Sequence, residues 1–192
     1  MGKIYLTSDW HVGEQQTPNT HSFLRPIPTE EMIPIWLEQC NRILTEDDTL
    51  IYLGDLAITL DDIDVYLQLP KCKKILILGD KEYANKNFTE EQFMSKIAEL
   101  NIFDEIYKEH NMNINGKDYF LTHKPLDCLL FDKPALCGHI HGCWRSAKMP
   151  NGNPILNVGI DAWGGLVSEE FVEHQYNAIT KFYDDNAFPS KW

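Results

Sequence analysis

Five short apolar runs in this chain end directly in an acid or a histidine. The first, residues 3–8, leads into Asp9-Trp10-His11. The pattern recurs at four further places: Gly54-Asp55, Gly79-Asp80, Thr122-His123 and Gly138-His139-Ile140-His141. Near-continuous apolar runs of this length are typical of strands covered on both faces, as in layered α/β proteins. The sequence therefore predicts a scaffold of strands that brings five loop segments together at one point.

The rest of the chain supplies helices between these runs. Thr29 is predicted to cap a helix over 29–44, because Glu30 and Glu31 follow it and apolar residues then recur at helical spacing. Thr89 and Gln92 form a capping box before a second helix that ends near residue 100. We also expect a long functional loop over 12–28 and strands at 49–53, 74–78, 118–121, 134–137 and 154–158. A short amphipathic segment contains Ile63, Tyr66 and Leu67, and Asn115-Gly116 indicates a hairpin turn. A last helix is predicted to be capped by Ser168, with its core stripe formed by Val172, Tyr176, Ile179 and Tyr183.

Length and composition indicate one folded unit. The chain has 192 residues, of which 43% are hydrophobic and 24% charged, the ordinary balance of a globular protein with one buried core. We expect a single domain over residues 1–192 that mixes strands and helices in layers. No apolar stretch approaches the roughly 20 residues that span a bilayer, and the first apolar run is too short for a signal peptide. We therefore expect a cytoplasmic protein with no membrane partner.

The charge and the cysteines exclude further classes. A formal net charge of −12 gives no long-range attraction to a nucleic-acid backbone, which argues against long nucleic acid as a partner. Small anionic substrates remain possible where metal ions supply local positive charge. The 5 cysteines are odd in number and include no Cys-x-x-Cys pair, so free thiols are expected. Among them Cys143, close after His141, is the one placed to touch a metal site.

The polar residues at the strand ends form a set of metal donors. They are three carboxylates and four imidazoles: Asp9, His11, Asp55, Asp80, His123, His139 and His141. This mixture suits Mn, Fe, Zn or Ni better than Ca or Mg, which prefer shells made only of oxygen. Seven donors exceed the needs of one ion, so two divalent ions that share a bridging carboxylate are predicted. Such a pair binds a phosphate between its ions and lowers the pKa of a bridging water.

The ordered set Asp9-x-His11, Gly54-Asp55, Gly79-Asp80-Lys81-Glu82, His123 and Gly138-His139-x-His141 resembles the calcineurin-like metallophosphoesterase superfamily. The resemblance spans residues 3 to 165 and is strongest to small bacterial and phage-encoded members. The features shared with these members include Asp47-Asp48-Thr49 and the segment 157–163. The resemblance implies a four-layer αββα sandwich of two mixed sheets flanked by helices. It also implies that Asp9, His11 and His141 hold one metal, that Asp80, His123 and His139 hold the other, and that Asp55 bridges.

The sequence departs from that family at residues 79–82. The family pattern there is Gly-Asn-His followed by an acid, whereas this chain has Asp80 and Lys81. Asp80 still offers a metal ligand, and its extra negative charge would hold an ion tightly while weakening its Lewis acidity. Lys81 replaces the histidine that assists the leaving group. It can neutralise charge on phosphoryl oxygens without a proton transfer, so we predict a catalytic and substrate-binding role for Lys81.

Two functions remain open from the sequence. The first is a dinuclear-metal phosphoesterase in which a metal-bound hydroxide attacks a phosphodiester, cyclic nucleotides included, or a phosphomonoester. The second is a catalytically attenuated member of the same fold that serves as an interaction or regulatory module, an alternative motivated by Asp80 and Lys81. The charge argues against a third function, a nuclease acting on long chains. The oligomeric state is not determined by the sequence.

Overall fold

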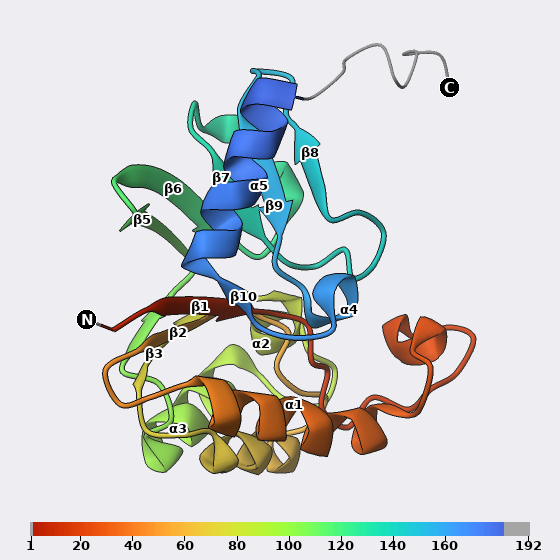
Figure 1. Cartoon of the computed structure of the whole chain (residues 1–192). Helices are drawn as coiled ribbons and strands as arrows, with labels where there is room; N and C mark the ends of the chain where they lie inside the picture. Colours follow the sequence, from red (N-terminus) through yellow and green to blue (C-terminus); the bar gives the residue numbers. More distant parts are fainter. Residues whose placement is uncertain (1, 183–192) are drawn as a thin grey trace.

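The computed structural model describes residues 2–182, and two five-stranded sheets form its centre (Figure 1). The first sheet has the order β10-β1-β2-β3-β4, with β1 to β4 parallel and β10 antiparallel to β1. Its strands are β1 (Ile4–Thr7), β2 (Thr49–Tyr52), β3 (Lys73–Ile77), β4 (Glu105–Tyr107) and β10 (Val167–Ser168). This mixed sheet carries the first three of the predicted strand ends.

The second sheet has the order β5-β6-β7-β9-β8. Strands β6, β7 and β9 are parallel, while β5 and β8 run antiparallel to their neighbours. Its strands are β5 (Glu109–Ile114), β6 (Lys117–Thr122), β7 (Ala135–Cys137), β8 (Ser146–Lys148) and β9 (Pro154–Asn157). Asn115 and Gly116 connect β5 to β6 with φ angles of 50° and 80°, which confirms the predicted hairpin turn.

Apolar side chains of the two sheets meet in one buried cluster, so the predicted sandwich of two mixed sheets is confirmed. Leu6, Ile51 and Ile77 of the first sheet region pack there with Leu121 and Leu136 of the second. The outer face of the first sheet is covered by α1 (Thr29–Ile43), α3 (Glu90–Leu100) and the 3-10 helix η2 (Asp61–Gln68), which share a second apolar cluster with it (Figure 1). A third, smaller cluster covers the second sheet and includes the 3-10 helix η3 (Pro125–Leu130).

The last helix, α5 (Glu169–Phe182), packs against β1, β8, β9 and β10. The backbone N–H of Phe171 donates to Ser168 Oγ over 3.3 Å, which confirms Ser168 as its cap. Val172 and Ile179 are buried as expected, and Tyr183 lies outside the described residues. No helix within residues 2–182 has both the length and the apolar character that crossing a bilayer requires.

Two local predictions are confirmed only in part. Helix α1 begins at Thr29 itself, after Pro28, and the Thr29 hydroxyl accepts a hydrogen bond from Arg25 instead of capping the helix. The amphipathic segment is a 3-10 helix, whose three-residue repeat places Ile63 and Tyr66 in the core but leaves Leu67 56% exposed. The two short helices α2 (Asp80–Tyr83) and α4 (Ile160–Trp163), the turn η1 (His21–Leu24) and the strands β4, β5, β8 and β10 carried no clear sequence signal.

Candidate functional site

All seven predicted donors follow strands whose carboxyl ends meet at one edge of the sandwich. Strands β1, β2 and β3 are parallel, as are β6 and β7, and the carboxyl ends of parallel strands lie together. The donors are Asp9 and His11 after β1, Asp55 after β2, Asp80 after β3, His123 after β6, and His139 and His141 after β7. We call these seven residues the Asp–His cluster.

The backbone of the Asp–His cluster is strained. Five of its members have positive φ angles between 49° and 74°, namely Asp9, His11, Asp55, His139 and His141. The other positive-φ residues besides glycine in the described chain are Asn101 and Asn115. Asn, Asp and His are the types other than glycine that adopt this region most often, yet it remains uncommon for them. Strain of this kind costs about 1–3 kcal/mol per residue and collects at functional sites.

Glycines before two of the donors allow the strand ends to approach closely. A Cβ on Gly54 would lie 2.5 Å from the Gly79 Cα, and a Cβ on Gly79 would lie 2.6 Å from the Asp55 backbone nitrogen. Both distances are too short for any side chain to be accommodated without a shift of the backbone. The glycines are therefore required where Asp55 and Asp80 are brought together.

The Asp–His cluster contains three groups whose ligand atoms lie within 4.8 Å of one another. Two are separate triads: Asp9 with His11 and His141, and Asp80 with His123 and His139. The third links them, because it joins Asp9 and Asp55 to His123. Asp55 stands between the triads, with Oδ2 at 3.4 Å from His11 Nε2 and Oδ1 at 3.4 Å from His123 Nε2.

Buried ring nitrogens in the Asp–His cluster lack hydrogen-bond partners. Both nitrogens of His11 and Nε2 of His123 are inaccessible and make no hydrogen bond within the described chain. Carboxylate oxygens of Glu14 and Asp55 lie 3.4–3.6 Å from them. Leaving a buried polar atom unpaired is costly, and such an atom calls for a ligand. Imidazole nitrogens aimed at carboxylates from 3.4 Å are a donor set that fits a borderline divalent cation. The residues present therefore fit a metal site.

The electrostatics of the cluster point the same way. Burial opposes ionisation of Asp55, but contact with His123 and then His11, together with the Lys81 N–H, holds the pKa of this carboxyl well below its usual range. Burial lowers the pKa of His123, yet Asp55 and Asp9 outweigh it and raise that pKa to about 10. Burial raises the pKa of Asp9 and lowers that of His11. The carboxylates therefore make the centre of the cluster a favourable position for a positive charge.

The sequence reasoning missed an ion pair that supports one side of the cluster. His141 Nδ1 lies 2.7 Å from Asp161 Oδ2, and Asp161 in turn is paired with Arg25 at 2.9 Å. Because Nδ1 donates to Asp161, the His141 ring presents Nε2 to its triad. Arg25 is 6% exposed and also donates to the carbonyl oxygens of Asp9 and Trp10. Asp161 lies in the segment 157–163, which the sequence analysis had already named, so the sequence contained a signal for this residue. Arg25 belongs to no motif that the sequence analysis named.

Glu82 is a second residue whose role the sequence left open. Its carboxylate accepts hydrogen bonds from the backbone nitrogens of Gly79, Asp55 and Leu56 over 2.6–3.0 Å. Burial, and after it the charge of Asp55, raises the pKa of Glu82. The residue is 1% exposed and ties the end of β2 to the end of β3. Its side chain therefore sets the spacing of Asp55 and Asp80.

The two unusual residues of the 79–82 segment occupy different surroundings. Asp80 is bound by Lys124, whose Nζ lies 2.7 Å from Oδ1, and it accepts a hydrogen bond from the Tyr83 hydroxyl. Lys81 donates its backbone N–H to Asp55 Oδ1 over 2.8 Å, and its side chain is half-buried. Lys81 therefore contacts the cluster through its backbone N–H.

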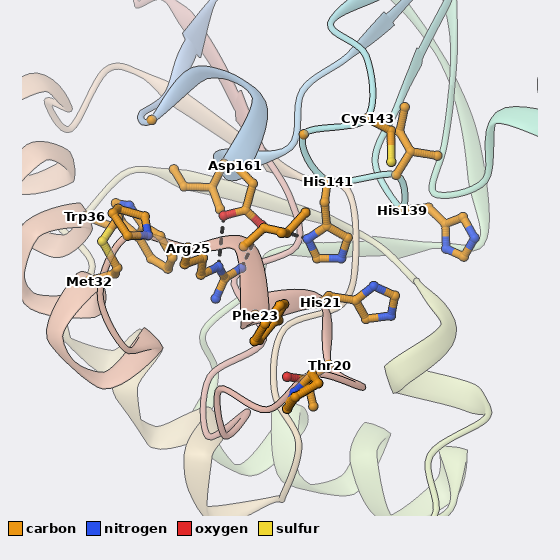
Figure 2. A pocket seen from close by; sticks show the side chains of 17 residues that line it. Thr20, His21, Phe23, Arg25, Met32, Trp36, His139, His141, Cys143 and Asp161 are labelled. Atoms are coloured by element: carbon orange, nitrogen blue, oxygen red, sulfur yellow. Dashed lines mark hydrogen bonds and ion pairs between the residues drawn. The ribbon is translucent and has the colours of Figure 1, made fainter.

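A pocket adjoins the cluster on the His141 side (Figure 2). Seven residues between 18 and 26 form one wall, which is consistent with the functional role expected for the loop 12–28. His21 was not predicted; its ring is stacked on that of His141 at 4.5 Å with an interplanar angle of 4°. Cys143 is exposed and lines the pocket, but it joins none of the three donor groups in the described part of the chain.

Comparison with known proteins identifies the fold. No family model and no curated protein sequence matches the chain. Among solved structures it is similar to a protein of unknown function from Aquifex aeolicus, with a TM-score of 0.64, 18% identity, and coverage of 91% of this chain and 99% of that one. A novel archaeal phosphodiesterase has a TM-score of 0.51 at 21% identity, with 84% and 86% covered. The phosphopantetheinyl hydrolase of Mycobacterium tuberculosis is similar with a TM-score of 0.52 and 14% identity, over 82% of this chain and 89% of that one.

Proposed function

We propose that this chain is a metal-dependent phosphoric ester hydrolase of the calcineurin-like metallophosphoesterase superfamily. One observation carries the proposal: two Asp–His triads flank Asp55, and buried nitrogens of His11 and His123 make no hydrogen bond within the described chain. Two of the structures with a similar fold are a phosphodiesterase and a phosphopantetheinyl hydrolase, which supports a hydrolytic reaction.

In this proposal the Asp–His cluster holds two divalent ions of Mn, Fe, Zn or Ni. Asp9, His11 and His141 hold the first, Asp80, His123 and His139 hold the second, and Asp55 is shared. Such ions act as Lewis acids toward phosphoryl oxygens and lower the pKa of a coordinated water. The −12 charge of the chain is compatible with a small anionic ester only if these ions supply local positive charge, and it argues against long nucleic acid.

Residues around the Asp–His cluster orient its metal donors and neutralise charge on the substrate. Glu82 and the Lys81 N–H fix the Asp55 carboxylate, and Asp161 fixes the His141 ring, so the donors are held before any ligand arrives. Lys81 follows Asp80 directly and donates its backbone N–H to Asp55, and in this proposal its ammonium stabilises the charge that develops on the leaving oxygen. Because an ammonium is a weak acid at neutral pH, we expect esters of good leaving groups to react best.

The test measures metal content and hydrolysis together. Purified protein loaded with Mn, Fe, Zn or Ni is expected to bind up to two equivalents and to cleave bis(4-nitrophenyl) phosphate, 4-nitrophenyl phosphate or a cyclic nucleotide. Asp55→Ala is expected to lower turnover by about 100-fold or more, since it removes the shared ligand. Less than one equivalent of bound metal and no turnover of any ester would instead assign the chain to the attenuated interaction or regulatory class.

A further inference from the structure

The pocket beside the Asp–His cluster has the size of a small-molecule site. Its volume is about 880 Å³, within the range of about 300–1,000 Å³ that ligand pockets occupy. Figure 2 shows the imidazoles of His21, His139 and His141 on one side and Met32 and Trp36 on the other. His139 and His141 belong to both the pocket and the cluster, so a ligand held at the cluster would extend directly into this space.

Among the residues that the structure describes, the pocket wall contains no unpaired Lys, Arg, Asp or Glu. Its charged residues are Arg25 and Asp161, which are paired with each other at 2.9 Å. All five N–H groups of Arg25 are used: two donate to the Asp161 carboxylate, two to the carbonyls of Asp9 and Trp10, and one to Thr29. A second phosphate or a carboxylate on the ligand would therefore find no cationic partner in this wall. The ligand part that enters must be uncharged.

The remaining lining is mainly apolar. Phe23 and Leu24 of the loop 12–28 form the exposed rim, at 48% and 88% exposure. Met32 and Trp36 of α1 and Ile160 of α4 complete the wall. Apolar residues on three separate segments thus face one cavity that opens at the proposed phosphate-binding residues.

We propose that this pocket binds the uncharged, apolar alcohol part, alkyl or aryl, of a phosphate ester whose phosphoryl group is held at the Asp–His cluster. The proposal rests on the proposed function and narrows its substrate class: the preferred esters have a bulky apolar group next to the phosphate. Nucleotides with further phosphates are disfavoured because Arg25 has no free donor for them.

A pair of phosphonates that cannot be hydrolysed tests the preference. Benzylphosphonate and methylphosphonate carry the same anionic group and differ only in the apolar part. With Mn-loaded protein, titration calorimetry is expected to find benzylphosphonate roughly tenfold to 100-fold tighter, the gain that burial of one phenyl ring provides. Equal affinities for the two compounds would overturn the proposal.

Two variants locate the effect. Phe23→Asp places a charge on the exposed rim and is expected to lower the ratio of benzylphosphonate affinity to methylphosphonate affinity at least fivefold; the ratio cancels the effect of the new charge on the shared phosphonate group. Leu130→Asp is the matched control, because Leu130 is 81% exposed but does not line the pocket. A preference that survives Phe23→Asp, or that falls equally in both variants, would contradict this location.

A third measurement separates this proposal from the hydrolase proposal. Cys143 is the exposed cysteine of the described chain and lines the pocket, so the rate of its alkylation by a maleimide reports occupancy, with Cys143→Ser to identify the signal. In the presence of a chelator, benzyl alcohol is expected to slow the alkylation of Cys143 severalfold. It is not expected to slow this reaction in the Phe23→Asp variant. Protection of Cys143 without metal binding or turnover would support the apolar pocket and contradict the proposed hydrolase function. Turnover without protection or apolar preference would support the hydrolase function and contradict the apolar pocket.

Discussion

Lys124 Nζ lies 2.7 Å from Asp80 Oδ1, so a lysine already neutralises this carboxylate. The pair brings the local charge close to zero. Both side chains are partly exposed, at 36% and 30%, and a pair of this kind contributes about 0.2–1 kcal/mol. Lys124 and Asp80 therefore form one ion pair at the edge of the Asp–His cluster.

Lys124→Met should therefore strengthen metal binding at Asp80, His123 and His139. The freed carboxylate oxygen is expected to tighten Mn binding by about 1.5-fold to fivefold, the equivalent of the lost ion pair. Calorimetric titration measures this. Lys96→Met is the control, since it removes an equal charge from a pair with Asp64 at 2.7 Å. Unchanged or weaker binding in Lys124→Met alone would show that Lys124 does not compete with the metal.

Lys81→His tests the leaving-group role of Lys81. An imidazole can donate a proton near neutral pH, and general acid catalysis typically contributes about 10²–10⁴-fold. Turnover of an ester with a poor leaving group, such as phenyl phosphate, should rise by about tenfold or more, while that of 4-nitrophenyl phosphate should change little. If both esters respond alike, Lys81 does not limit departure of the alcohol.

Glu82→Gln should destabilise the protein without any metal present. Glu82 accepts three backbone N–H groups, and an amide can accept with only one oxygen, so at least one buried donor loses its partner. We expect a loss of about 1–3 kcal/mol in the free energy of unfolding, measured with urea in chelator. Glu91→Gln on the exposed face of α3 is the control. Equal stability of the two variants would exclude a role for Glu82 in holding the strand ends.

Asp161→Asn should weaken metal binding through His141. The carboxylate accepts from His141 Nδ1 over 2.7 Å and fixes the ring so that Nε2 faces Asp9 and His11. Loss of such an outer partner typically lowers metal affinity by about 10–100-fold. Zn titration against a chromophoric chelator measures the change. An affinity equal to that of the unaltered protein would mean that the rest of the fold orients His141.

Asp48→Asn should reduce stability in a pH-dependent way. Hydrogen bonds from the Lys3 N–H and then from Thr45 hold the pKa of the Asp48 carboxyl below its usual value. The unfolded chain takes up this proton near pH 3.9, whereas the folded protein keeps the ionised form to lower pH. The contribution is therefore complete at pH 7, about 1–2 kcal/mol, and declines as the pH falls below 3.9.

Urea unfolding at pH 7 and at pH 3.5 measures the difference between Asp48→Asn and the unaltered protein. The gap should be larger at pH 7. Asp132→Asn serves as the control, because the Asp132 carboxyl belongs to a surface loop and accepts one hydrogen bond from Asn153. A gap that stays constant with pH would show that the charge of Asp48 is not what stabilises this turn.

The sequence alone determined the features that depend on neighbouring residues. Apolar runs that end in Asp or His predicted the strand ends, and local hydrogen-bonding chemistry predicted the capping box at Thr89 and the turn at Asn115-Gly116. The seven members of the Asp–His cluster were all named in this way, because each follows a run that is long enough to form a buried strand. Their roles toward metal stay predictions.

The tertiary structure decided what depends on residues far apart in the chain. Arg25 meets Asp161 across 136 positions, and the edge strand β5 has few apolar residues and only Ile114 fully buried, so neither leaves a local pattern. Lys124 follows His123 but reaches Asp80 only because β3 and β6 end at the same edge of the sandwich. Local chemistry therefore fixed which groups are present, and packing fixed which partner each one meets.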